Sequence, residues 1–317
     1  MRQVMGRAVT VTVGVLLAAA LAAGCTDITG TGGPGAGAAG PASPGGASAA
    51  GRPAANAPLR ATASGTGTSA AGTSGTAAPS AADGAAATPS GHPGPLAGKV
   101  IVLDPGHNGA NWSHPAIINR LVNVITEWKP CDTTGAETDA GYPEHAFNFD
   151  VATRLARLLR AEGATVVLTR PNDTGVGPCV TQRAAIGNRA HAAAAISIHA
   201  DGGPPSGTGF EVIEPGLIPG HNGAIIAPSD RLGLAIRNAY HRITGEPYSD
   251  YVGTQGLDVR TDLGGLNLST VPKVFIECAN MRNATDAAKL TSPAFRERIA
   301  VALAAGFTAF LAPGSHP

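Results

Sequence analysis

Lys99-Val-Ile-Val-Leu103, followed at once by Asp104-Pro-Gly-His107, is the stretch that decides the fold of this chain. A short apolar run rich in Val and Ile that stops at Pro and Gly is typical of a buried strand with a sharp end. Further runs of this kind follow along the chain. We predict buried strands over residues 165–169, 195–199 and 274–277, and a more exposed, alternating strand over residues 209–213.

Segments with helical spacing alternate with these strands. In residues 144–162 the apolar side chains of Phe147, Val151 and Leu155 recur every fourth position, and Gly163 ends the segment. Further helices are predicted over residues 181–190, 229–244 with Ser229 as the cap, and 293–311. Strands that alternate with helices favour a single α/β domain, with a mostly parallel, twisted central sheet flanked by helices on both faces.

The first 96 residues of the chain differ in composition from the rest. Residues 1–25 have a basic start, an apolar stretch and a small-residue stop, which is the pattern of an export signal, with an uncleaved anchor as the alternative. Leu21-Ala-Ala-Gly-Cys25 resembles a lipoprotein cleavage box, although its Leu lies one place too far from the Cys. We expect lipidation of Cys25, against ordinary cleavage and release. Residues 26–96 are mainly Gly, Ala, Ser, Thr and Pro without an aromatic residue, which predicts a disordered, flexible linker.

One ordered domain, residues 97–313, and a tail over residues 314–317 complete the predicted organisation. The length of the ordered domain supports a single substantial hydrophobic core. The chain is formally neutral, with 22 basic and 22 acidic residues, and it has no basic stripe, so nucleic acid is not an expected partner. We expect a monomer in the cell envelope, at the outer face of the cytoplasmic membrane or in the cell wall, touching the membrane only through a lipid anchor.

The cysteines fit an exported protein. Cys131 and Cys179 lie in polar loops that contain Gly or Pro, and they are candidates for a disulfide. Cys278 follows a strongly apolar run, which predicts a buried thiol.

Three polar residues stand where an open sheet gathers its ligands, near the carboxyl ends of strands, and a fourth stands at the start of the long helix. His107 lies just past the first strand, His199 and Glu277 end two others, and Glu144 begins the long helix. A desolvated carboxylate is costly unless a cation or several donors lie beside it. Two imidazoles and one carboxylate with an open fourth position form a known catalytic zinc set, and a second carboxylate can act as general base. Singly, each residue also fits a structural role, such as a partner for the helix dipole.

Four segments in this order resemble the zinc-dependent N-acetylmuramoyl-L-alanine amidases of the amidase-3 type, in particular the compact cell-wall amidases of high-GC bacteria. They are Lys99-Val-Ile-Val-Leu-Asp-Pro-Gly-His-Asn-Gly109, Glu144 before its helix, Ser197-Ile-His-Ala-Asp201 and Val274-Phe-Ile-Glu277. The resemblance implies hydrolysis of the amide bond between N-acetylmuramic acid and L-alanine in peptidoglycan, during cell-wall remodelling or daughter-cell separation.

The resemblance also implies roles for individual residues. One Zn²⁺ per chain is expected on His107, Glu144 and His199, with Glu277 as the catalytic base. Cys131 and Cys179 are expected to pair, as they do in the compact relatives.

Two further expectations concern the surroundings of the site. Asp104 and Asp201 are expected either to orient the histidines as hydrogen-bond acceptors or to be plain turn residues. Some relatives carry a helical insertion that blocks the groove. The corresponding stretch here, residues 214–228, is short and rich in Gly and Pro. We therefore predict a loop at the groove edge and no strong self-inhibition.

Two alternative functions stay open at this stage. A zinc peptidase could cut within the stem peptide, but the His-x-x-Glu pair common in zinc carboxypeptidases is absent, because His107 is followed by Asn108-Gly-Ala110. A non-catalytic wall-binding protein would be expected to lack one of the ligands or Glu277, and none is missing.

Overall fold

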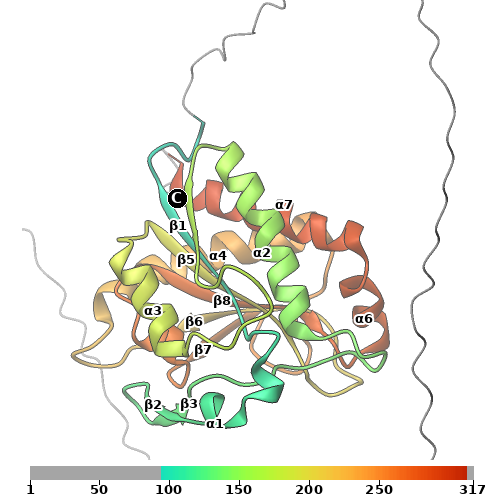
Figure 1. Cartoon of the computed structure of the whole chain (residues 1–317). Helices are drawn as coiled ribbons and strands as arrows, with labels where there is room; N and C mark the ends of the chain where they lie inside the picture. Colours follow the sequence, from blue (N-terminus) through green and yellow to red (C-terminus); the bar gives the residue numbers. More distant parts are fainter. Residues whose placement is uncertain (1–93, 313–317) are drawn as a thin grey trace, which may run out of the picture. The chain divides into compact units, whose positions relative to one another are not determined.

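A six-stranded sheet forms the centre of the part of the chain that the computed structural model describes, residues 94–312 (Figure 1). The predicted export signal, Cys25, almost all of the predicted linker and the tail lie outside these residues. Within them, no helix combines the length and the apolar character needed to cross a bilayer.

The order of the strands across the sheet is β4-β1-β5-β8-β6-β7. Neighbouring strands from β4 to β8 run parallel, β6 runs antiparallel to β8, and β7 runs parallel to β6. The predicted mostly parallel sheet is therefore confirmed. The strands are β1 (Val100–Pro105), β4 (Thr165–Leu168), β5 (Ala194–Asp201), β6 (Glu211–Pro215), β7 (Leu257–Arg260) and β8 (Lys273–Asn280).

Helices cover the two faces of the sheet unequally. The three long helices, α2 (Glu144–Ala161), α4 (Gly223–Thr244) and α7 (Pro293–Leu311), share the main hydrophobic core with one face. The other face is covered by α3 (Val180–Arg189) and the short α5 (Gly264–Asn267), with a much smaller apolar cluster. The smaller elements are η1 (Asn111–Ser113), α1 (Pro115–Ile118), the antiparallel pair β2 (Leu121–Asn123) and β3 (Trp128–Pro130), and α6 (Ala284–Leu290).

The two-residue period of the strands separates the core from the polar side chains. Successive side chains of a strand point to opposite faces of the sheet. On β1, β5 and β8, one set of alternate residues enters the main core: Ile101, Leu103, Ile196, Ile198, Val274 and Ile276. The intervening positions on these three strands include Asp104, Ser197, His199, Lys273, Phe275 and Glu277. Polar groups from three neighbouring strands therefore collect on the thinly covered face.

Three expectations about the middle of the chain were wrong. Strand β6 is not an exposed strand: all five of its residues are buried, because it lies between β8 and β7 with α4 packed against it. Helix α4 begins at Gly223 and includes Pro228, so the predicted loop over 214–228 is partly helical. Ser229 is no cap but a fully buried helix residue whose Oγ accepts a hydrogen bond from the backbone N–H of Lys273. Packing of α4 against β6, β8 and α7 outweighs the local cost of a proline within the helix.

Candidate metal centre

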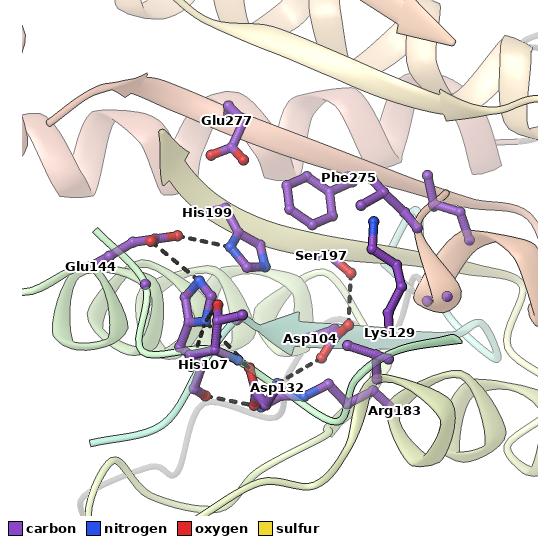
Figure 2. Close-up of a pocket in the computed structure, with 18 of the residues that line it drawn as sticks. Asp104, His107, Lys129, Asp132, Glu144, Arg183, Ser197, His199, Phe275 and Glu277 are labelled. Atoms are coloured by element: carbon purple, nitrogen blue, oxygen red, sulfur yellow. Dashed lines mark hydrogen bonds and ion pairs between the residues drawn. The ribbon is translucent and has the colours of Figure 1, made fainter. Parts of the chain in front are cut away.

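The side chains of His107, Glu144 and His199 meet at one point (Figure 2). His107 follows β1, Glu144 is the first residue of α2, and His199 lies near the end of β5. One possible ligand atom from each lies within 4.8 Å of those of the other two. His107 Nε2 is 3.2 Å from Glu144 Oε2, and His199 Nδ1 is 2.8 Å from Glu144 Oε1. The fold thus brings together three residues that are far apart in the sequence.

The charges at this point favour a cation. Burial alone would raise the pKa of Glu144, but His107 and His199 beside it hold that pKa well below its usual range. Burial alone would lower the pKa of His107, yet Glu144 and Asp132 raise it to about 10. For His199 burial prevails and lowers the pKa. Buried negative charge therefore holds a proton on His107, and two imidazoles with a carboxylate are a donor set that suits Zn²⁺ in its place.

Glycines let the backbone approach these side chains closely. A Cβ on Gly106 would lie 2.0 Å from His199 Cε1 and Nε2. Gly135, whose φ is +82°, would place a Cβ 2.7 Å from Glu144 Oε2 and from His107 Cδ2. Both distances are far shorter than a van der Waals contact, so these two positions require glycine.

The change Gly106→Ala tests this packing. We expect it to displace the His199 ring and to lower divalent-metal affinity by about tenfold or more, which is the loss produced by misplacing a ligand. Chelator competition measures the affinity, and circular dichroism checks the fold. Gly187→Ala is the matched control, because its Cβ would come no closer than 3.8 Å to the nearest atom, Val271 Cγ2. An unchanged affinity in Gly106→Ala would contradict the packing argument.

Glu277 is the second carboxylate at this site. It is the register partner of His199 across the parallel pair β5 and β8. Its Oε2 atom is buried and has no hydrogen-bond partner within residues 94–312. Burial, and then the charges of Glu144 and Asp201, raise its pKa well above the usual value. Phe275, two residues earlier on the same face, stacks on the His199 ring with centroids 4.1 Å apart.

These residues line a cleft of about 390 Å³. Its walls include Lys129 from β3 and Asp262 and Leu263 from the loop after β7. The Lys129 ammonium lies 2.7 Å from the Asp262 carboxylate, so two segments distant in sequence are joined at the wall. A cleft of this size suits a substrate segment rather than an ion alone.

Asp104 and Asp201 were expected either to orient the histidines or to be turn residues, and within residues 94–312 neither has a hydrogen bond with a histidine. Asp104 accepts hydrogen bonds from Thr169, Ser197, Arg183 and Lys273, and none from a histidine. Asp201 accepts one from the backbone N–H of Gly202. Asp104 thus neutralises the buried side chains of Arg183 and Lys273. The carboxylate that contacts the Nδ1 atom of His107 belongs to Asp132, which sequence reasoning missed, because a single Asp in a polar loop gives no periodic signal.

The other local expectations are confirmed. Cys131 and Cys179 form a disulfide, and Cys278 is a buried free thiol. His145, the neighbour of Glu144, does not join the cluster, because its Nδ1 atom lies 2.7 Å from Asp173 Oδ2.

Glu211 is a further buried carboxyl, opposite Glu277 in the antiparallel pair of β6 and β8. Its Oε2 atom has no hydrogen-bond partner among the described residues. Burial, and then Asp201, raise its pKa to about 8. A carboxyl whose pKa is higher in the folded than in the unfolded chain stabilises the fold below its unfolded pKa, and this contribution is lost as the pH rises through the folded pKa.

The change Glu211→Gln should therefore alter how stability depends on pH. The wild-type protein is expected to lose stability between about pH 4.5 and pH 8, because ionising this buried carboxyl costs free energy. Glutamine stays neutral, so the variant should be more stable than the wild type at pH 8 by about 1–3 kcal/mol, and closer to it at pH 4.5. Urea unfolding at both pH values measures the difference. If the variant and the wild type differ in unfolding free energy by the same amount at both pH values, the raised pKa of Glu211 is refuted.

An α/β domain that gathers two imidazoles and a carboxylate at one edge of its sheet, with another buried carboxylate beside them, has an arrangement that metal-dependent hydrolases use. Comparison with known proteins agrees. The family model described as N-acetylmuramoyl-L-alanine amidase matches residues 101–309. The chain belongs to this family, as its sequence motifs predict.

The chain matches individual relatives over nearly the whole of their length. An N-acetylmuramoyl-L-alanine amidase of Mycobacterium tuberculosis is 41% identical over 234 residues, which is 72% of this chain and 95% of the relative. The crystal structure of an N-acetylmuramyl-L-alanine amidase from Mycobacterium smegmatis superimposes with a TM-score of 0.65 at 42% identity, covering 68% of this chain and 98% of that one. The corresponding amidase of Mycobacterium abscessus gives a TM-score of 0.65 at 41% identity, over 68% of this chain and 100% of its own.

Proposed function

We propose that this chain hydrolyses the amide bond between N-acetylmuramic acid and L-alanine of peptidoglycan, with one zinc ion held by His107, Glu144 and His199. The observation that carries the proposal is the convergence of these three side chains within 4.8 Å, with Glu277 beside them on the same face of the sheet. Membership of the amidase family supports the choice of bond.

The donor set fits zinc and leaves room for chemistry. Each imidazole presents to Glu144 a nitrogen that can bind the ion, and three protein ligands leave a fourth position open. A zinc ion held there would supply Lewis acidity toward the amide carbonyl and toward water. The rest of the reaction falls to the side chains of the chain itself.

Glu277 is the group placed to move the proton. As general base it takes a proton from the attacking water, and as general acid it returns that proton to the nitrogen of the departing L-alanine. Repulsion from Glu144 and Asp201 contributes to its raised pKa. A cation held by the triad would offset this repulsion, and the pKa of Glu277 would then move down toward the range in which a carboxyl both accepts and returns a proton.

The wider assignment follows from the substrate. Peptidoglycan lies outside the cytoplasmic membrane, so we place the protein in the cell envelope. The export signal over residues 1–25, lipidation of Cys25, the flexible linker over residues 26–96 and a monomeric catalytic domain over residues 97–313 complete this proposal. Peptidoglycan or its muropeptide fragments are the partners it requires.

Digestion of purified muropeptides followed by mass spectrometry tests the proposal. We expect two products: a glycan with a free lactyl carboxylate and a stem peptide with a free L-alanine amine. A cut elsewhere in the peptide would favour a zinc peptidase, and binding without a cut would favour a wall-binding protein. A chelator should abolish cleavage, and added Zn²⁺ should restore it.

A further inference from the structure

The loop after β3 contacts the nitrogen of His107 that does not face Glu144. His107 Nε2 lies 3.2 Å from Glu144 Oε2, whereas Nδ1 lies 3.3 Å from Asp132 Oδ1 and 3.1 Å from the carbonyl oxygen of Thr133. An imidazole that binds a cation through one nitrogen carries its proton on the other. His107 Nδ1 is thus placed to donate to this loop, and an acceptor there sets the tautomer and the angle of the ring.

Asp132 is itself held by charge. Its Oδ2 accepts a hydrogen bond from Arg183 Nη2 at 3.0 Å, and its Oδ1 accepts one from the backbone N–H of Thr133 at 2.8 Å. The same Nη2 group donates to the backbone carbonyl of His107 at 2.9 Å. The buried guanidinium of Arg183 therefore links the Asp132 carboxylate to the main chain of His107 (Figure 2).

The disulfide fixes both ends of this ion pair. Cys131 immediately precedes Asp132, and Cys179 stands one helical turn before Arg183. The backbone N–H of Val180 also donates to the carbonyl of Cys131 at 2.9 Å. The loop and the start of α3 are thus joined by a covalent bond, a backbone hydrogen bond and a buried ion pair.

We infer that Asp132 is a positioning residue for His107, and that the Cys131–Cys179 disulfide holds it in place, so that severing the disulfide weakens the hold of the site on its cation. The inference rests on the proposed function only in requiring that the triad binds a divalent cation. Asp132 is not one of the three converging side chains, and it acts through the ring of His107.

Zinc affinity, measured by chelator competition, and the visible spectrum of the Co²⁺-substituted protein test this inference. Asp132→Ala is expected to lower zinc affinity by about 10- to 100-fold and to change the Co²⁺ spectrum, because the ring of His107 loses its carboxylate acceptor and keeps only the Thr133 loop as a partner. Asp132→Asn, whose amide oxygen can still accept the hydrogen bond, should recover most of the affinity. The double variant Cys131→Ser/Cys179→Ser should fall between Asp132→Ala and the wild type.

Asp173→Ala is the matched control. Asp173 pairs with His145 at 2.7 Å in the way that Asp132 pairs with His107, but outside the triad, so its loss should leave zinc affinity unchanged. Thermal unfolding of the metal-free variants distinguishes the positioning role from a purely structural one. A purely structural role would lower the melting temperature without changing the zinc affinity of the folded protein.

Wild-type affinity and an unaltered Co²⁺ spectrum in folded Asp132→Ala would overturn the inference. If that variant does not fold, the double serine variant decides in its place: reduced zinc affinity supports the inference, and wild-type affinity overturns it. A wild-type protein that binds zinc but leaves muropeptides uncut would contradict the proposed function alone, because neither readout here uses peptidoglycan.

Discussion

Replacing Glu277 by alanine is expected to lower amidase turnover by about 10²- to 10⁴-fold while one zinc ion per chain stays bound. The carboxyl lies beside the triad but is not one of its three converging side chains, so its loss removes proton transfer and leaves the ligands intact. Removing a buried carboxyl whose pKa is raised should not destabilise the fold. Turnover on muropeptides and zinc content by elemental analysis, measured on the same preparation, check both halves.

Two comparisons make this result specific. Glu297→Ala removes a carboxylate of α7 that pairs with Arg154 and Arg157 on the surface, and it should cleave muropeptides at the wild-type rate. Wild-type turnover in Glu277→Ala would mean that another group moves the proton. Loss of zinc together with turnover would mean that Glu277 is a ligand.

Replacing His199 by alanine is expected to abolish both zinc binding and turnover. The change removes one of three ligands and the ring on which Phe275 stacks, so zinc affinity should fall by more than about 100-fold, beyond the loss expected when only a hydrogen-bond partner of a ligand is removed. Chelator competition measures the affinity, and muropeptide digestion measures turnover.

His145→Ala is the control for that experiment. His145 neighbours Glu144 in sequence, but its ring pairs with Asp173, so zinc should bind His145→Ala as it binds the wild type. Retained zinc and turnover in His199→Ala would remove His199 from the site and, with it, the proposed triad.

Much of the site could be predicted because local patterns position its members. His107, His199 and Glu277 each follow or end a strongly apolar run, and parallel strands bring their carboxyl ends to one edge. Glu144 could be assigned as a ligand only through the family resemblance, because a carboxylate at a helix start has a common structural role. The disulfide likewise drew on the compact relatives.

The features that sequence reasoning missed depend on contacts distant in the chain. Asp132 lies in a loop without periodicity, and its place next to His107 is set by Arg183, 51 residues later. The burial of β6 depends on β7 and α4 covering it, which its own alternating pattern does not reveal. Helix α4 extends through Pro228 because the packed helix tolerates a local penalty that would end an isolated one.

The most direct test is an anomalous difference map at the zinc absorption edge from crystals of the zinc-loaded protein. We expect one peak per chain, about 2.0–2.2 Å from one nitrogen of His107, one nitrogen of His199 and a carboxylate oxygen of Glu144, with Glu277 beyond bonding distance. A muropeptide-cleaving protein with no peak at these three side chains, or with its zinc elsewhere, would contradict the account.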